Sequence, residues 1–265
     1  MHGKLDIASR LKQLLSASRG MPGTQQASRP TSENDSKQDI PYFDEYHELR
    51  KYVVPLPPLA LMVKAGAPTV ENFLVVGDVW AQVIGKLLVP RSVMLDIGCG
   101  CGRIPRFLVN FPGVSYIGFD ILQPSVDWCS EHLTPKSNGR FRFYHIDGFS
   151  QYYNPTGSIE AGQVKFPTED AMVDLAIAAS VFTHLKEPDA KHYLEEARRV
   201  LKTGGMALFS IHINTKPGCQ FQGDEARIDI EPEYFVQLAE NANLKLKERI
   251  GKLCGQETFL FEAVE

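Results

Sequence analysis

Apolar positions along the chain follow two different spacings from residue 92 onward. Short apolar runs predict buried strands, and apolar residues recurring every three or four positions predict amphipathic helices. The expected strands are 93–95, 115–119, 141–146, 173–179 and 206–213. The expected helices are 104–111, 124–133, 190–201 and 232–242, and two final apolar segments, 244–250 and 257–264, predict a closing hairpin. Strands that alternate with helices in this way indicate an α/β protein with a mostly parallel sheet covered on both faces.

The first 90 residues have a weaker pattern. Segment 70–89 predicts a helix in two pieces separated near Gly77, and aromatic, charged segment 42–52 predicts a short helix. Segment 18–39 has no aromatic residue, Val, Ile or Leu, so we expect it to be disordered. Before it, apolar residues at helical spacing between 5 and 15 suit either a docking helix or a frayed tail. We therefore expect a tail at 1–40, a helical cap or lid at 41–90 and the main domain at 91–265.

Composition and charge exclude several classes of protein. The chain has 265 residues, 43% hydrophobic and 23% charged, which is ordinary for a globular protein. Its net charge of −4 disfavours nucleic acid as a partner, and no apolar run approaches the ~20 residues of a membrane span. Five scattered cysteines without a CxxC pair predict neither a disulfide framework nor a zinc knuckle, and they suit a reducing cytoplasm.

A glycine-rich loop follows the first expected strand. Asp96 comes two residues before Gly98, Gly100 and Gly102, a G-x-G-x-G spacing that differs from the G-x-G-x-x-G of dinucleotide-binding proteins. Glycines let the backbone turn sharply and approach a ligand closely, although three glycines also occur in a plain tight turn. The Asp96 carboxylate would repel a pyrophosphate but suits a ligand with an ammonium group. The loop therefore favours a nucleoside that carries an amino-acid end.

Acidic residues also follow the next two expected strands. Asp120 ends the second strand, where a carboxylate can accept hydrogen bonds from both hydroxyls of a ribose. Asp147 ends the third strand and could accept a hydrogen bond from an adenine amino group. Because the carboxyl ends of parallel strands meet at one edge of a sheet, we expect these residues near the glycine loop.

In this combination the sequence resembles the class I S-adenosylmethionine-dependent methyltransferases over roughly residues 70–265. Segment 96–102 looks like their first motif, segment 174–185 like the strand-four motif at the sulfonium end, and segment 196–205 like their helix and turn before strand five. The resemblance implies a Rossmann-like, doubly wound, mostly parallel seven-stranded sheet with an antiparallel last strand. It also implies S-adenosyl-L-methionine as cofactor, with ten contact residues: Asp96, Gly98, Cys99, Gly100, Gly102, Asp120, Ile121, Asp147, Gly148 and Ser180.

The implied reaction moves a methyl group to a nucleophilic atom, and a general base is needed only where that atom must lose a proton. His184 follows the fourth strand and is a candidate base, and His212 near the end of the fifth strand is a second, weaker candidate. Either histidine could instead hold a loop. The histidines have no metal-ligand spacing, so we predict no metal. Cys99 and Cys101 are expected to be small loop residues rather than nucleophiles.

The acceptor pocket should form from whatever overhangs the strand ends, and several aromatic segments are candidates. We expect a methyltransferase acting on an oxygen or nitrogen of a small molecule or saccharide. A protein or RNA methyltransferase would share the same cofactor motifs, and a nucleotide-dependent oxidoreductase or a non-catalytic binding module would share the fold. The sequence leaves the acceptor and the oligomeric state open. The candidate pocket segments are Tyr42, Phe43, Tyr46 and Tyr52, the helix after Phe73, the loop with Phe149, Tyr152 and Tyr153, and segment 214–231.

Overall fold

A central β-sheet organises the protein in the computed structural model, which describes residues 54–216 and 218–265. The expected tail, the segment 5–15 and the short helix at 42–52 lie outside the described residues. Seven strands form the main part of the sheet, in the order β3-β2-β1-β4-β5-β9-β8, and the strands with the strongest apolar runs, β1 and β4, lie inside it. Their bounds are β1 Val93–Ile97, β2 Ser115–Asp120, β3 Phe141–His145, β4 Val173–Ala178, β5 Leu201–Ile213, β8 Leu244–Leu253 and β9 Gln256–Ala263.

The strand directions confirm the predicted Rossmann-like class. Strands β1 to β5 pair in parallel, whereas β9 runs antiparallel to β5 and forms the closing hairpin with β8. A hairpin of β6 (Phe221–Asp224) and β7 (Arg227–Ile230), which the sequence pattern did not predict, adds to this seven-stranded core. Strand β7 pairs in parallel with the last two residues of β5, so the hairpin extends beyond the carboxyl edge of the sheet.

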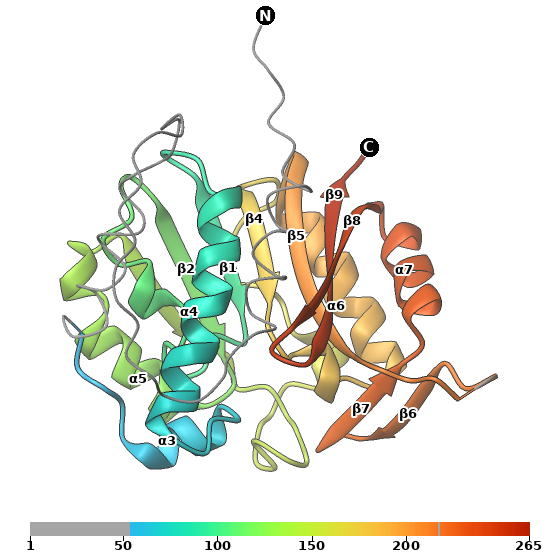
Figure 1. The fold of residues 1–265 in the computed structure, drawn as a ribbon, viewed down its shortest axis with the longest axis horizontal. Coiled ribbons are helices and arrows are strands. Elements are labelled where there is room, and N and C mark those ends of the chain that lie inside the picture. Colours follow the sequence, from blue (N-terminus) through green and yellow to red (C-terminus); the bar gives the residue numbers. More distant parts are fainter. Residues whose placement is uncertain (1–53, 217) are drawn as a thin grey trace, which may run out of the picture.

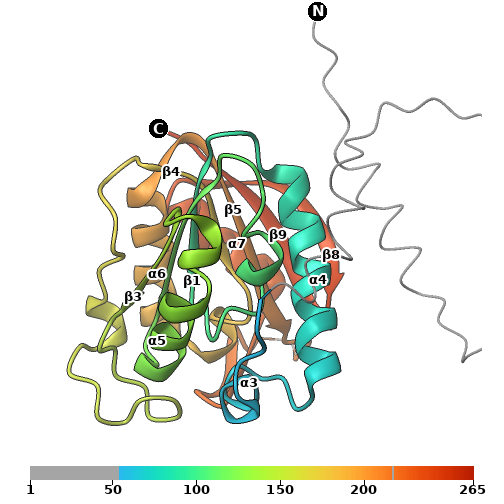
Figure 2. The ribbon, with the colours of Figure 1, turned by 90° about the vertical axis from the view of Figure 1, so that its left-hand side faces the viewer.

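Helices cover both faces of the sheet, as the doubly wound class requires. Helices α4 (Val70–Leu87) and α5 (Gln123–His132) bury their apolar sides in one core, and α6 (Glu187–Val200) and α7 (Pro232–Asn241) bury theirs in the other. Figure 1 shows α4 crossing in front of the strands, and Figure 2 shows the sheet edge-on between α4 and α6. A short helix, α3 (Leu59–Lys64), lies near the carboxyl ends of the parallel strands. Among the described residues, no helix is long and apolar enough to cross a membrane.

Helix α4 is continuous, which corrects the expected break near Gly77. Thr69 caps its start, where the side-chain oxygen accepts a hydrogen bond from the backbone N–H of Asn72 at 3.1 Å. Gly77 is buried instead at a close approach between α4 and the glycine-loop segment. A Cβ at Gly77 would stand 2.2 Å from the carbonyl oxygen of Arg103. The glycine therefore permits tight packing rather than ending the helix.

This packing predicts the effect of Gly77→Ala. In an open helix, Gly→Ala stabilises by up to about 1 kcal/mol, whereas overpacking a tight core costs about 1–3 kcal/mol. Because the new methyl group would meet the Arg103 backbone, we expect a lower free energy of unfolding in urea. Gly162→Ala is the matched control, since its Cβ would come no closer than 3.4 Å to Asp189. Equal or greater stability of Gly77→Ala would refute this explanation of the glycine.

Two other expectations are corrected by the structure. Segment 104–111 forms only a 3-10 turn at Pro105–Phe107 and not an amphipathic helix. An amphipathic helix keeps one polar face in solvent, but here Arg106 is fully buried and donates a hydrogen bond to the carbonyl oxygen of Val54 at 2.8 Å. Strand β5 begins at Leu201 rather than at residue 206, because Leu201 already pairs with Val173 of β4. The segment with Gly204 and Gly205 forms an irregularity in the pairing before Met206 pairs with Leu175.

Candidate active site

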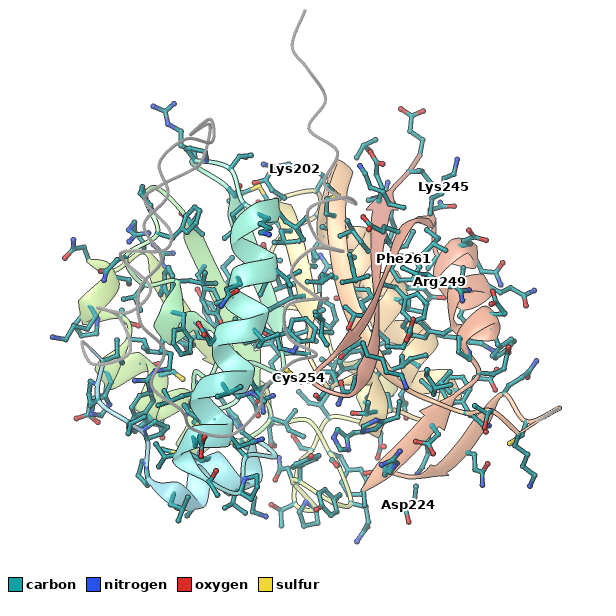
Figure 3. The ribbon with its side chains drawn as sticks, viewed as in Figure 1. Lys202, Asp224, Lys245, Arg249, Cys254 and Phe261 are labelled. Atoms are coloured by element: carbon teal, nitrogen blue, oxygen red, sulfur yellow. The ribbon has the colours of Figure 1, made fainter. Side chains whose placement is uncertain are left out.

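A cavity of about 500 Å³ lies at the carboxyl ends of the parallel strands. This volume is within the range typical of small-ligand sites, roughly 300–1,000 Å³. Its walls come from the ends of β1, β2, β4 and β5, the end of α3, the long loop after β3, the β6–β7 turn and the start of β9. Figure 3 marks the two hairpin turns at this end with Asp224 and Cys254, while Lys202 and Lys245 mark the opposite end of the sheet.

The glycine loop forms one wall of the cavity. Gly98 and Gly100 have left-handed φ values of +70° and +54°, and both line the cavity with Cys99. A Cβ at Gly98 would stand 2.6 Å from Cγ2 of Val181, so only glycine fits there without displacement. Gly102 also has a left-handed φ, +79°, but it is not among the lining residues. It packs against α5 instead, where a Cβ would stand 2.5 Å from Cδ1 of Leu133.

Asp96 brings a buried carboxyl group to the cavity at the end of β1. Only 1% of the residue is exposed, and its Oδ2 accepts a hydrogen bond from the Tyr116 hydroxyl at 2.6 Å. Burial raises the pKa of Asp96 to about 7, although the Tyr116 hydrogen bond opposes the rise. The group is therefore poised to lose a proton when a cation binds beside it.

Asp120 holds the glycine loop from the end of β2. Its Oδ2 accepts a hydrogen bond from the backbone N–H of Gly100 at 2.7 Å, and its Oδ1 accepts one from Leu122 at 2.9 Å. Burial raises the pKa of Asp120, and these backbone hydrogen bonds oppose the rise. Since a carboxylate has about four acceptor positions, two remain for hydroxyl groups of a ligand in the cavity. Ile121, the next residue, also lines the cavity.

Asp147, unlike Asp96 and Asp120, is not among the residues that line the cavity. Its Oδ2 accepts hydrogen bonds from the hydroxyl and backbone N–H of Ser158 at 2.7 and 3.1 Å, and its Oδ1 accepts one from Asn154 at 3.3 Å. These hydrogen bonds hold the pKa of Asp147 below its usual range. Its neighbour Gly148 does line the cavity. The adenine contact of Asp147 therefore stays a prediction.

Ser180 lies at the end of β4 in a strained conformation, with a left-handed φ of +66°. Its backbone N–H donates to Oγ of Ser210 at 3.0 Å, and the amide of Gln256 donates to its hydroxyl at 2.8 Å. Gln256 also lines the cavity, just after the turn with Cys254 that Figure 3 labels. The network joins β4, β5 and β9 at the cavity, and a network of this kind stabilises a strained residue.

His184 reaches the cavity from a 3-10 turn after β4. Its Nδ1 lies 2.8 Å from the carbonyl oxygen of Glu225, and its Nε2 lies 3.0 Å from the Tyr153 hydroxyl. A carbonyl only accepts hydrogen bonds, so Nδ1 carries the proton and Nε2 accepts from Tyr153. Burial lowers the pKa of His184, and the Glu225 carbonyl opposes this. Burial raises the pKa of Tyr153 to about 12.

Glu225 fixes the position of this histidine through contacts on three sides. Its carboxylate accepts a hydrogen bond from the Ser150 hydroxyl at 2.9 Å and pairs with Lys186 at 3.1 Å. The β6–β7 turn that carries Glu225 is thereby tied to the loop after β3 and to the residue before α6. His212, at the end of β5, lines the same cavity, and burial followed by the charge of Arg227 lowers its pKa.

Comparison with known proteins identifies this arrangement. Residues 95–209 match the methyltransferase domain family, and they include the glycine loop, Asp120 and His184. The chain contains a class I S-adenosylmethionine-dependent methyltransferase domain. S-adenosyl-L-methionine is its cofactor.

Solved structures of low sequence identity share the fold of this methyltransferase. The 1,6-didemethyltoxoflavin-N1-methyltransferase of Burkholderia thailandensis is 16% identical with a TM-score of 0.56, and the match covers 93% of this chain and 100% of that chain. A TehB-like methyltransferase of Corynebacterium glutamicum is 17% identical with a TM-score of 0.51, covering 85% and 100%. A third structure is a Haloferax volcanii complex of the Trm112 methyltransferase activator with a methyltransferase. It is 17% identical with a TM-score of 0.54, and the match covers 78% of this chain and 95% of that chain.

The structure brings most of the predicted methyltransferase site together. Of the twelve predicted site residues, only Gly102 and Asp147 are not among the residues that line the cavity. Tyr152, Tyr153 and Phe149 line it as candidate acceptor residues, and Ala226 does so from segment 214–231. The helix after Phe73 was also expected to line the acceptor pocket, but helix α4 contributes no lining residue, and that expectation is corrected. The candidates between Tyr42 and Tyr52 lie outside the described residues.

Sequence reasoning missed the lining residues Lys64, Ala65, Gly66, Arg103 and Gln256. Arg103 follows the glycine loop directly, and this position could have indicated it. Its guanidinium donates a hydrogen bond to the carbonyl oxygen of Ala65 at 3.1 Å, which connects the loop to the end of α3. Gln256 comes from a distant hairpin and had no local signal. Within residues 54–216 and 218–265, no group of three or more His, Cys, Asp or Glu residues is placed to hold a metal.

The raised pKa of Asp96 predicts that cofactor binding releases a proton. Below about pH 7 the ligand-free carboxyl group is protonated, and an ammonium group beside it favours the ionised form. Binding of S-adenosylhomocysteine near pH 6 should therefore release a large part of one proton, and binding near pH 8.5 very little. Calorimetry in buffers of different ionisation enthalpy measures this release. Asp96→Asn should abolish the pH dependence, and an equal release at both pH values would contradict it.

Proposed function

We propose that the protein transfers a methyl group to an oxygen or nitrogen atom of a small-molecule or saccharide acceptor, with His184 as general base. The observation that carries the proposal is the pair of Tyr153 and His184, whose hydrogen bond of 3.0 Å lies in the wall of the cavity. A neutral imidazole that can take a proton at Nε2, here through the Tyr153 hydroxyl, is what an acceptor hydroxyl requires as it is methylated.

The residues of the cofactor half fit S-adenosylmethionine. Asp96 offers a carboxyl group to an ammonium, and Asp120 has acceptor positions for two ribose hydroxyls. Gly98 and Gly100 leave the loop without side chains at these positions, so a ligand can approach the backbone. The cofactor, when bound, supplies an electrophilic methyl group on its sulfonium. Positioning of the two reactants accounts for much of the rate in such a displacement.

His184 and Tyr153 provide a path for the acceptor proton. The Tyr153 hydroxyl donates to Nε2 of His184, which leaves the phenol oxygen free to accept a hydrogen bond from an acceptor hydroxyl. As the acceptor oxygen forms its bond to carbon, its proton passes to the Tyr153 oxygen while the Tyr153 proton passes to Nε2. The step ends with a neutral phenol and an imidazolium. The Glu225 carbonyl stabilises that imidazolium at Nδ1.

Several observations favour a small acceptor over protein or RNA. The cavity is walled by Tyr152, Tyr153 and the β6–β7 turn, and the net charge of −4 offers no general attraction for a nucleic acid. The similar Burkholderia structure holds the small molecule 1,6-didemethyltoxoflavin together with S-adenosylhomocysteine.

The five cysteines are free thiols, which suits a reducing cytoplasm as the place of action.

The test follows a labelled methyl group. The protein is incubated with methyl-tritiated S-adenosylmethionine and with two fractions of a cell extract, one of small molecules and one of macromolecules. We expect label in the small-molecule fraction, in a product that disappears with His184→Gln. Label in RNA or protein, still dependent on His184, would replace this proposal with the corresponding macromolecular methyltransferase.

A further inference from the structure

The acceptor half of the cavity has three rings in an ordered arrangement. The rings of Tyr152 and His184 are parallel within 4° with centroids 6.4 Å apart. The ring of Tyr153 is almost perpendicular to both, at 88° to Tyr152 and 90° to His184, with centroid distances of 4.7 and 5.0 Å. All three residues line the cavity. Ring faces and edges presented in two directions form a surface that favours another aromatic ring over a saturated one.

Tyr152 indicates that this ring surface is open to a ligand. It lines the cavity and yet remains 55% exposed, although a large aromatic side chain gains stability by burial. Tyr153 and His184 beside it are only half-buried. A flat ligand against the three rings would remove this apolar area from water.

The charges around the rings favour an acceptor that becomes negative. Among the described lining residues, the only carboxylates are Asp96 and Asp120, which we assign to the cofactor, although the charge of Asp120 also contributes to the raised pKa of Tyr153. The lining also includes Lys64, Arg103 and two histidines, and no described carboxylate forms an ion pair with Lys64 or Arg103. The charge of Arg103 favours the ionised form of Tyr153, and the Glu225 carboxylate near His184 is paired with Lys186. Cationic and N–H groups stabilise an oxyanion as it forms. Further carboxylates would be expected beside a sugar with several hydroxyl donors, and the described lining has none besides Asp96 and Asp120.

We propose that the acceptor is a small planar phenol, whose ring lies against Tyr152, Tyr153 and His184 and whose hydroxyl oxygen receives the methyl group. This inference rests on the methyl transfer proposed above and narrows its acceptor from small molecules in general to phenols. A phenol with an ordinary pKa near 10 is more acidic than Tyr153, so the Tyr153–His184 pair can remove its proton more easily than that of an alkyl or sugar hydroxyl. The proton passes to His184 and the methyl group to the phenol oxygen.

The test uses the protein saturated with S-adenosylhomocysteine and three probes: 4-methylphenol, its saturated counterpart 4-methylcyclohexanol, and methyl glucoside. Calorimetry or ligand-observed NMR gives their dissociation constants. We expect the phenol to bind about tenfold more tightly than the cyclohexanol, with the glucoside weakest. Similar affinities for the three probes, or no measurable binding of the phenol while S-adenosylhomocysteine binds, would overturn the proposal.

Two variants test whether 4-methylphenol binds against the rings of Tyr152, Tyr153 and His184. Tyr152→Leu should weaken binding of 4-methylphenol about tenfold and leave the affinity for S-adenosylhomocysteine unchanged. Tyr144→Leu is the control, because Tyr144 is an exposed tyrosine on β3 that does not line the cavity. Equal affinity in wild type and Tyr152→Leu would reject the ring surface as the binding site.

The labelled-methyl experiment separates this proposal from the broader function. Label in a non-aromatic small molecule would reject the phenol and leave the small-molecule methyltransferase in place. Label only in macromolecules would reject both proposals. Label in a phenolic product, lost in His184→Gln, would support both.

Discussion

Replacing Asp120 with Ala should raise the dissociation constant for S-adenosylhomocysteine by about 10²- to 10⁴-fold. Two charge-assisted hydrogen bonds from ribose hydroxyls would be lost, each worth about 1.5–3 kcal/mol. The same change removes the hydrogen bonds that Asp120 accepts from the backbone N–H groups of Gly100 and Leu122. The glycine loop would then no longer be held to the end of β2 by this side chain. Calorimetric titration of wild type and variant measures the difference.

Two further variants make this result specific. Asp120→Asn keeps the shape of the side chain without its charge, so its affinity should lie between those of wild type and Asp120→Ala. Asp127→Ala removes a carboxylate from α5 that does not line the cavity, and we expect wild-type affinity. Circular dichroism verifies that each variant is folded. A folded Asp120→Ala protein with unchanged affinity would show that the carboxylate does not hold the cofactor.

Replacing His184 with Gln should lower the rate of methyl transfer by about 10²- to 10⁴-fold, the usual contribution of a general base. The affinity for S-adenosylhomocysteine should change little, because we propose that His184 acts on the acceptor and not on the cofactor. Burial lowers the pKa of His184, so the imidazole is neutral at neutral pH, and the rate should fall as the pH drops through that pKa, below about 6.5. Single-turnover rates of methyl transfer between about pH 5 and 8 measure both effects.

The pH profile distinguishes a base from a residue that only holds a loop. In His184→Gln the rate of methyl transfer should be low at every pH, and it should no longer fall as the pH drops below about 6.5. His132→Gln is the control, because His132 stacks on Trp128 and does not line the cavity. A variant at His184 that is slower but keeps the wild-type acidic limb would assign the base to another group, with His212 as the first alternative.

Much of the fold follows from local sequence signals. The apolar runs of β1 to β5 and the spacing of α5, α6 and α7 depend on neighbouring residues, so they could be predicted within a few positions. The failures occurred where distant contacts decide the structure. Gly77 resembles a helix break until the backbone of Arg103 is placed against it. Segment 104–111 has helical spacing, but the burial of Arg106 against Val54 leaves it no solvent face.

The site shows the same division between local and distant signals. Asp96 and Asp120 lie at the ends of β1 and β2 and the glycines follow β1, so the sequence shows which edge of the sheet they share. Gln256 reaches the cavity only because the β8–β9 hairpin folds back beside β5, and no spacing in the sequence indicates that. The orientation of His184 depends on Glu225, 41 positions further along the chain. The boundary between a helical cap and the main domain at residues 90 and 91 stays a prediction.

The most direct test of this account is calorimetric titration of the wild-type protein with S-adenosylhomocysteine, alongside NADH as a nucleotide with a pyrophosphate. The cavity predicts one binding site for S-adenosylhomocysteine, with proton release from Asp96 at acidic pH. It predicts no binding of NADH near pH 8.5, where the ionised Asp96 carboxylate would repel its pyrophosphate. Binding of NADH without binding of S-adenosylhomocysteine would contradict the account of the cofactor site, and with it the methyl transfer assigned to this cavity.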